Sequence, residues 1–328
     1  METVITAEKL QKTFITSGAT YGFLGSIKGL LNPVRNEIEA VKSISFIVNK
    51  GERIAFIGPN GAGKSTTIKM LAGILHPTDG ELKVAGLNPQ KQRQKLAYKI
   101  GTVFGQKSQL WPHLPASHTF NLLSKIYDLD EVTYKKRVKD LTEIFSIGPF
   151  LEQTVRKMSL GQRMRCEIVA SLLHKPEILF LDEPTIGLDI VAKSIIRDLV
   201  KTTSELDSTT VFLTSHDTGD MERVCDRVLV INNGEILLDN SISEVRKSYI
   251  RRKRITLLTE EENVDIQLKG VKLIESLPHS LKIEVDSNMI AIDTVIQEAF
   301  KLTKLRDITV EDPPMEEIVQ DIYENFKL

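Results

Sequence analysis

Residues 58–65 read Gly-Pro-Asn-Gly-Ala-Gly-Lys-Ser, the spacing G-x-x-x-x-G-K-S of a phosphate-binding loop, and Thr66 follows. Glycines let backbone N–H groups approach phosphate oxygens without an intervening Cβ. Lys64 adds a positive charge for the β- and γ-phosphates, and the Ser65 hydroxyl can bind Mg²⁺. The motif predicts a nucleoside triphosphate site. Its expected contacts are Gly58, Pro59, Asn60, Gly61, Ala62, Gly63, Lys64, Ser65 and Thr66.

The flanking sequence places this loop between a strand and a helix. Residues 53–57 predict a buried strand entering the loop, and residues 65–75 predict a helix leaving it. The phosphates would then lie at a helix N-terminus, where unpaired N–H groups and the helix dipole favour anions. In this context an ordinary glycine-rich turn is a poor explanation of the motif.

Three further hydrophobic runs predict buried strands that end in polar residues. They are 100–104 with Gln106, 178–181 with Asp182 and Glu183, and 211–214 with His216. Open α/β sheets form their sites beyond the carboxyl ends of parallel strands, so we expect these groups to meet the phosphate-binding loop there. Asp182 alone could be a helix cap, and His216 a packed histidine. Together they favour a site in which one carboxylate holds the metal, directly or through water, and its neighbour faces the attacking water.

The composition sets broad limits. A chain of 328 residues can hold one large and one small domain, and its 41% hydrophobic and 27% charged residues are ordinary for a soluble globular protein. The net charge of −1 predicts no general attraction to nucleic acid or anionic membranes. Cys166 and Cys225 lack metal-binding spacing and suit a reducing cytoplasm. No apolar run near 18 residues and no signal peptide are found, so we expect no membrane span.

The N-terminal region contains an unusual insertion. Residues 3–14 predict a strand and turn, and Phe14 is a candidate either for stacking on a nucleotide base or for plain packing. Within residues 15–39 an amphipathic helix is predicted, but each glycine in it costs about 1 kcal/mol relative to alanine. Such a helix needs a surface to dock on: the chain's own sheet, a membrane-embedded partner or the membrane interface. Its apolar face is Phe23, Leu24, Ile27, Leu30 and Leu31.

The middle of the chain predicts a helical subdomain inserted into an α/β core, at about 107–175. Helical periodicity covers 110–150, and a helix opening at 158–162 runs to His174. Trp111 lies in a loop of the kind that meets partners. Farther on, residues 226–238 predict a β-hairpin around Asn-Asn-Gly.

A basic stretch at 246–254 marks the end of the larger domain, 1–245. We interpret it as a linker that is either solvated or in contact with lipid headgroups. Residues 255–328 predict a small α+β accessory domain. Its expected strands are 255–258, 271–276, 280–285 and 305–310, with helices at 291–302 and after Pro314.

In their order and spacing, these motifs resemble the ATP-binding cassette (ABC) transporter ATPases over roughly residues 1–245. Gly58 to Thr66 is similar to Walker A, Gln106 to the Q-loop, Ser159-Leu-Gly-Gln162 to the signature motif, residues 178–182 to Walker B with Glu183 as its catalytic glutamate, residues 187–189 to the D-loop with Asp189, and His216 to the switch histidine. The implied fold is a P-loop α/β core with a mixed sheet and a helical subdomain.

The resemblance also implies a mechanism. Two copies would form a head-to-tail dimer around two ATP molecules, with Ser65, Gln106 and Asp182 on Mg²⁺ and with Glu183, His216 and Gln106 as catalytic residues. Ser159, Gly161, Gln162 and Asp189 would contact the nucleotide as well, the signature residues reaching it from the partner copy. Met158 and Leu160 depart from the family's usual Leu-Ser-Gly-Gly-Gln, which puts the hydrolysis rate, more than γ-phosphate capture, in question.

A finer resemblance, to type-2 ABC exporters of drugs, antibiotics and sodium, is carried by residues 103–111, residues 159–165 and the long segment before Walker A. It implies an ATPase motor bound to separate integral membrane permease subunits at the cytoplasmic face, without nucleic acid. Two alternatives remain at this point. One is a soluble ABC-type ATPase acting on nucleic acid or ribosomes, and the other is a non-transporting ATP-sensing regulator.

Overall fold

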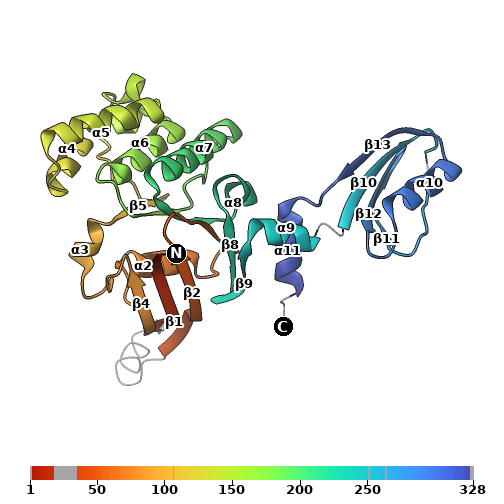
Figure 1. Ribbon diagram of the computed structural model, residues 1–328, viewed down its shortest axis with the longest axis horizontal. Coiled ribbons are helices and arrows are strands. Elements are labelled where there is room, and N and C mark those ends of the chain that lie inside the picture. The colour runs from red at the N-terminus through yellow and green to blue at the C-terminus, as the bar shows by residue number, and fades with distance from the viewer. Residues whose placement is uncertain (1, 18–34, 106, 250–251, 263, 326–328) are drawn as a thin grey trace, which may run out of the picture. The chain divides into compact units, whose positions relative to one another are not determined.

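The computed structural model describes residues 2–17, 35–105, 107–249, 252–262 and 264–325 (Figure 1). The chain divides into two compact units, Met1–Asp239 and Asn240–Leu328. No helix among the described residues is long and apolar enough to cross a membrane.

A six-stranded sheet, with strand order β5-β6-β7-β3-β8-β9, forms the centre of the first unit. The pairs from β5 to β8 are all parallel, so their carboxyl ends lie at one edge, as the sequence predicts. The turn between β8 and β9 contains Asn233 and Gly234 with positive φ, which suits a tight hairpin. The strands are β3 (Arg53–Ile57), β5 (Ile100–Phe104), β6 (Ile178–Asp182), β7 (Thr210–Ser215), β8 (Arg227–Asn232) and β9 (Glu235–Ser241).

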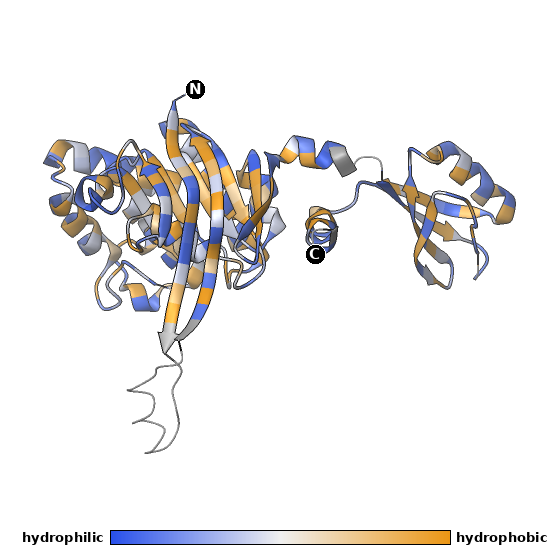
Figure 2. Ribbon diagram, turned by 90° about the horizontal axis from the view of Figure 1, so that it is seen from below, coloured by the Kyte–Doolittle hydropathy of each residue, from blue (hydrophilic) through white to orange (hydrophobic). Residues whose placement is uncertain are grey.

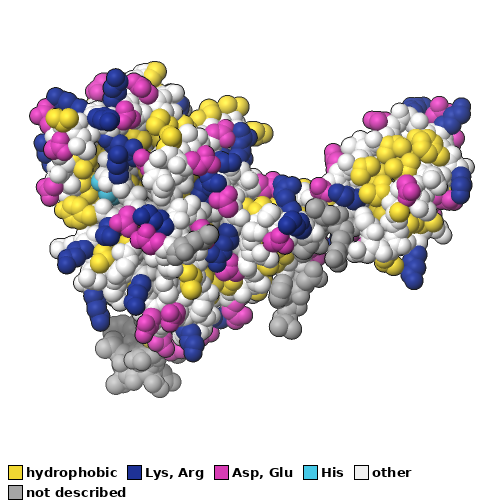
Figure 3. Space-filling model, viewed as in Figure 1, with side chains coloured by type: hydrophobic (Ala, Val, Ile, Leu, Met, Phe, Trp, Pro, Cys, Tyr) yellow, Lys and Arg dark blue, Asp and Glu magenta, His cyan; other side chains and the backbone are white. Residues whose placement is uncertain are grey.

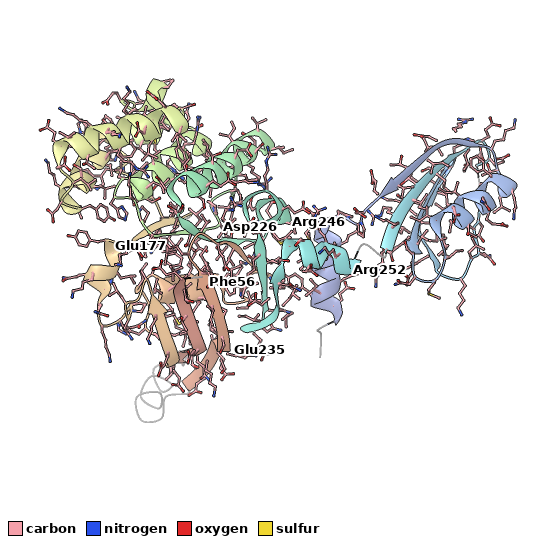
Figure 4. The ribbon with its side chains drawn as sticks, in the orientation of Figure 1. Phe56, Glu177, Asp226, Glu235, Arg246 and Arg252 are labelled. Carbon is pink, nitrogen blue, oxygen red and sulfur yellow. The ribbon has the colours of Figure 1, made fainter. Side chains whose placement is uncertain are left out.

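A second, antiparallel sheet with order β2-β1-β4 completes the core of this unit. Its strands are β1 (Thr3–Ser17), β2 (Arg35–Asn49) and β4 (Asp79–Val84). Bands of hydrophobic and hydrophilic residues alternate along β1 and β2 (Figure 2). Phe46 of β2 packs against Phe212 of the central sheet with ring centroids 5.9 Å apart, and Phe56 lies 5.4 Å from Phe212 (Figure 4). These buried rings join the two sheets around one hydrophobic core.

The insertion expected at 15–39 begins and ends in strand, since β1 continues to Ser17 and β2 starts at Arg35. The two strands pair as an antiparallel arm with several register shifts before Phe14, and the pairing continues to Ser17 opposite Arg35. The predicted apolar face, residues 23–31, lies outside the described residues.

Helices cover the sheet and build the predicted helical insertion between β5 and β6. They are α2 (Lys64–Leu71), α3 (Arg93–Ala97), α4 (Ala116–Ile126), α5 (Glu131–Ile144), α6 (Leu160–Leu172), α7 (Ile190–Asp207) and α8 (Thr218–Val224), with short 3-10 turns at Gly148–Phe150 and Val155–Lys157. Phe120, Leu141 and Phe145 are fully buried and give this insertion its own hydrophobic packing.

Arg137 joins three helices of this unit. From α5 its guanidinium donates hydrogen bonds to the backbone oxygen of Leu172 at 3.1 and 3.2 Å, and it forms an ion pair with Asp207 at the end of α7. The Arg137 side chain is only 8% exposed. Asp207 therefore neutralises a charge that would be costly to leave buried.

We expect Asp207→Asn to lower the free energy of unfolding by about 2–3 kcal/mol, because it leaves the buried charge of Arg137 without its partner. This value is smaller than that for a fully buried pair because Asp207 is partly exposed. Urea unfolding followed by circular dichroism measures this. Glu131→Gln, which breaks the exposed i,i+4 pair with Lys135, is the matched control and should leave the free energy of unfolding almost unchanged. Equal effects of the two variants would contradict the account of Arg137.

The second unit contains a four-stranded antiparallel sheet, order β11-β12-β10-β13, and its described residues form three helices. Val295 and Ala299 of α10 are buried against the sheet. Exposed hydrophobic side chains gather on one face of this unit (Figure 3). The elements are α9 (Ile242–Tyr249), β10 (Arg252–Thr259), β11 (Val271–Leu277), β12 (Ser280–Asp286), α10 (Ile292–Leu302), β13 (Leu305–Glu311) and α11 (Met315–Asn325).

The basic stretch 246–254 differs from the linker that its composition suggests. Residues 246–249 belong to α9, and residues 252–254 begin β10. Carboxylates of the same unit neutralise the basic side chains, which reduces their attraction for lipid headgroups. The ion pairs are Lys247–Glu244, Arg252–Asp321, Lys253–Asp312 and Arg254–Glu317. The domain limits 1–245 and 255–328 stay a prediction.

Candidate active site

The carboxyl ends of the central strands surround a cavity of about 590 Å³. Polar residues from the ends of β6 and β7 reach it, together with the loop after β3. The sequence-predicted residues that line it are Asn60, Gly61, Gly63, Lys64, Ser65, Thr66, Asp182, Glu183 and His216. Gln106 lies outside the described residues.

The glycine-rich loop depends on glycine at the position where it enters α2. Gly63, the residue before α2, has φ 106°, and a Cβ there would lie 2.5 Å from the backbone oxygen of Ala40. Only glycine fits a left-handed position with so close a contact. Lys64 donates hydrogen bonds to the backbone oxygens of Gly58 at 2.6 Å and Pro59 at 3.1 Å. Burial lowers the pKa of Lys64, and the charges of Glu183 and Asp182 oppose that shift.

Two oxygen ligands suited to Mg²⁺ converge beside this loop. Ser65 Oγ lies 3.0 Å from Asp182 Oδ1, and Thr214 Oγ1 donates to the same carboxylate oxygen at 2.6 Å. Among the described residues no group of three or more histidine, cysteine or carboxylate side chains is placed to hold a metal. This sparse set fits Mg²⁺, which binds through one or two protein oxygens together with substrate phosphates and water.

Glu183 lies between Lys64 and His216 at the carboxyl edge of the central sheet. One carboxylate oxygen is 3.7 Å from Lys64 Nζ, and the other is 3.4 Å from His216 Nδ1. The backbone of Glu183 has φ 53°, a left-handed conformation that costs a non-glycine residue about 1–2 kcal/mol. Its N–H donates to both the backbone oxygen and the hydroxyl of Thr214, at 3.0 and 3.2 Å. Thr214 thus holds the strained backbone of Glu183 in place and orients the carboxylate of Asp182.

The predicted signature residues lie in a separate hollow of about 460 Å³, which shares no lining residue with the phosphate cavity. Ser159 is the N-cap of α6: its hydroxyl accepts a hydrogen bond from the Gln162 backbone N–H, and its own backbone N–H donates to the Gln162 side chain, which completes a capping box. Asp189 caps α7 through a 2.8 Å bond from the N–H of Ala192. Ser159, Gly161, Gln162 and Asp189 all line this second hollow.

Leu160, the departure in the signature motif, packs within the chain. A Cβ at Gly187 would lie only 3.2 Å from a methyl carbon of Leu160, which places this side chain against the loop before α7. Gly187 has φ 73° and no side chain, so it leaves room for the leucine. The substitution is therefore accommodated without disturbing the cap at Ser159.

Phe14 is not among the residues that line the phosphate cavity. It is 37% exposed on β1, with Lys12 Nζ 5.2 Å from its ring centre. Sequence reasoning missed other lining residues and the strand-end hydroxyl of Thr214 described above. The missed lining residues are Ala40, Lys69, Ile74, Phe104, Gly105, Lys107 and Ile186. Only Thr214, a polar residue ending a hydrophobic run, carried a signal that could have found it.

The phosphate-binding part of the chain matches a family model. The model for the ABC transporter family matches residues 41–186. The ABC transporter ATP-binding protein NatA of Bacillus subtilis is 30% identical over 211 residues, which cover 64% of this chain and 85% of NatA. The bacitracin transport ATP-binding protein BcrA of Bacillus licheniformis is 30% identical over 237 residues, 72% of this chain and 74% of BcrA.

Solved structures of the same kind share the fold. The dimeric post-hydrolysis structure of the ATP-binding cassette MJ0796 bound to ADP and Pi superposes with a TM-score of 0.59 at 25% identity. The match covers 73% of this chain and 98% of the solved chain. The P-loop core with its mixed sheet and helices, expected from the sequence, is confirmed by this likeness.

Proposed function

This chain belongs to the ATP-binding, ATP-hydrolysing proteins of ABC transporters, and from that membership we propose that it is the motor subunit of an exporter. The observation that carries the proposal is the group of Lys64, Glu183 and His216 beside the Ser65–Asp182 pair. The relative named for bacitracin transport supports the export of an antibiotic-like or other small compound as the coupled process.

The chain's own residues divide the work of hydrolysis. Lys64 and the N-terminus of α2 hold the phosphates. Glu183 accepts a hydrogen bond from the attacking water, and His216, 3.4 Å away, orients that carboxylate. Ser65 and Asp182, with Gln106, would hold Mg²⁺, which when bound neutralises charge on the β- and γ-phosphates. Phosphoryl transfer depends mainly on such positioning and charge stabilisation.

A second copy of this chain would complete each site. The signature residues line a hollow of their own, so within one chain they do not contact the phosphate cavity. Beside them Ile190 and Val191 are 86% and 69% exposed, an apolar surface next to the capping Asp189. A head-to-tail partner would cover these side chains and bring Ser159, Gly161 and Gln162 to the nucleotide.

A groove on the helical subdomain is the proposed contact with a membrane permease at the cytoplasmic face. It has a volume of about 590 Å³. Trp111 is 48% exposed and Leu122 is 36% exposed on its wall, so a helix of the permease could insert an apolar side chain there. The groove is lined by Trp111, Leu114, Ser117, His118, Asn121, Leu122, Lys125, Tyr134 and Glu152.

The first experiment is to purify the tagged chain from its native membrane in mild detergent and to identify its companions. We expect integral membrane subunits, and Leu122→Glu should reduce their recovery at least about tenfold, because it buries a charge in a central apolar contact. Val132→Glu, at a position 79% exposed on α5 outside the groove, is the matched control and should leave recovery unchanged. Ribosomes or nucleic acid in place of membrane subunits would contradict the proposal.

A further inference from the structure

A buried carboxylate on α8, that of Asp220, joins three segments near the carboxyl ends of β6 and β7. Asp220 is 1% exposed. Its Oδ2 accepts hydrogen bonds from Thr185 Oγ1 and from Ser215 Oγ, both at 2.6 Å, and its Oδ1 accepts from Arg197 Nε at 2.6 Å. Charge-assisted hydrogen bonds of this length are among the stronger polar contacts in proteins, so Asp220 links these segments firmly.

Two of the three partners lie beside residues with proposed roles in hydrolysis. Thr185 follows Glu183 by two positions, and Ser215 directly precedes His216. Both hydroxyl residues are buried, at 4% and 2% exposure. Through its Oδ2 atom, Asp220 therefore connects the loop that carries Glu183 to the loop that carries His216.

The third partner, Arg197, belongs to a helix that borders the hollow of the signature residues. Arg197 lies on α7, the helix that Asp189 caps. It also contacts Asp217, at 3.0 Å, and Lys193 of the same helix lies 2.6 Å from Asp217. Gly219 gives the guanidinium room, because a Cβ there would lie 2.9 Å from an Arg197 nitrogen. Helix α7 is thus attached directly to Asp217, which follows His216, and through Asp220 to Ser215, which precedes it.

We propose that Asp220 is a positioning residue for ATP hydrolysis. It keeps the Glu183–His216 pair in register and couples that pair, through Arg197, to the Asp189 end of α7. The inference rests on the roles given to Glu183 and His216 under the proposed function. A change at the Asp189 end of α7 reaches the catalytic pair through the helix and a hydrogen-bonded path, in which the partly exposed Arg197 and the buried Asp220 are the central links.

The test compares Asp220→Ala with Asp198→Asn in the full chain. Asp198 of α7 forms an exposed ion pair with Arg223 of α8, at 2.8 and 2.9 Å, so it joins the same two helices without touching either catalytic loop. We expect Asp220→Ala to lower the kcat for ATP about 10²-fold, the scale of an ångström-sized misplacement, with the ATP Kd changed less than about threefold. Asp198→Asn should change neither.

Asp220→Asn grades the effect. Its amide oxygen can still accept from Arg197 and its NH₂ can donate to both hydroxyls, so we expect this variant to recover much of the lost kcat. Where Asp220→Ala does not fold, Ser215→Ala and Thr185→Val each remove one hydroxyl and are expected to lower kcat about tenfold.

Two results would overturn the inference. One is a folded Asp220→Ala protein with wild-type kcat, and the other is a loss of kcat matched by an equal loss of ATP affinity, as general damage produces. Glu183→Gln is assayed in parallel. If that variant keeps wild-type turnover, the proposed roles fail; if it is inactive while all Asp220, Ser215 and Thr185 variants are active, only the positioning role fails.

Discussion

Replacing Glu183 by glutamine lowers the ATP turnover number by about 10²–10⁴-fold and leaves ATP binding intact. Glutamine has the same shape, so contacts with Lys64 and the neighbouring His216 persist at their present separations of 3.7 and 3.4 Å or close to them. An amide cannot accept the proton of the attacking water, however, and the step that needs a base is lost. The effect should therefore fall on kcat and not on the ATP Kd.

The measurement is steady-state phosphate release together with titration of a fluorescent ATP analogue. Glu177→Gln is the matched control, since Glu177 directly precedes the same strand, β6, at its opposite end (Figure 4). Its carboxylate pairs with Lys99 at the surface, at 2.8 Å. That variant should turn over ATP like the wild type. Wild-type kcat in Glu183→Gln would sink the assignment of the catalytic glutamate.

Local sequence signals predicted most of the fold. Hydrophobic runs that end in Asp182 and His216 mark strands because burial on both faces requires continuous apolar sequence. The loop at 58–65 is recognisable from the sequence because its own backbone conformation requires glycine. In the second unit every expected strand appears, and along β12 every second side chain is buried, as in a sheet with one buried face.

Contacts between distant segments account for what the sequence could not predict. Thr214 and Asp220 matter through partners such as Asp182 and Thr185, 32 and 35 positions away along the chain. The composition of the basic run at 252–254 predicts a linker. In the structure, acidic residues about sixty positions later form ion pairs with it. Phe14 has the right chemistry for a base, but the fold of the β1–β2 arm decides where it lies.

Two inactive variants should restore activity when they are mixed. Lys64→Ala removes the phosphate-binding charge, and Ser159→Arg places a bulky cation in the signature hollow. Each alone should lose at least about 10²-fold in turnover, since both sites of its dimer are damaged. In a mixed head-to-tail dimer both defects fall in one site and the other is intact, so random exchange should recover about one quarter of wild-type activity.

The matched control is a mixture of Lys64→Ala with Glu183→Gln. Both defects then lie in the phosphate cavity of their own chain, so every dimer has two damaged sites and the mixture should stay inactive. Differently tagged copies show whether subunits exchange before ATPase activity is read. Exchange without recovery would contradict the head-to-tail dimer, and so would a Ser159→Arg variant with full turnover. If only the first mixture recovers activity, Ser159 must act on the nucleotide held by the partner copy. The two separate hollows in one chain imply this arrangement.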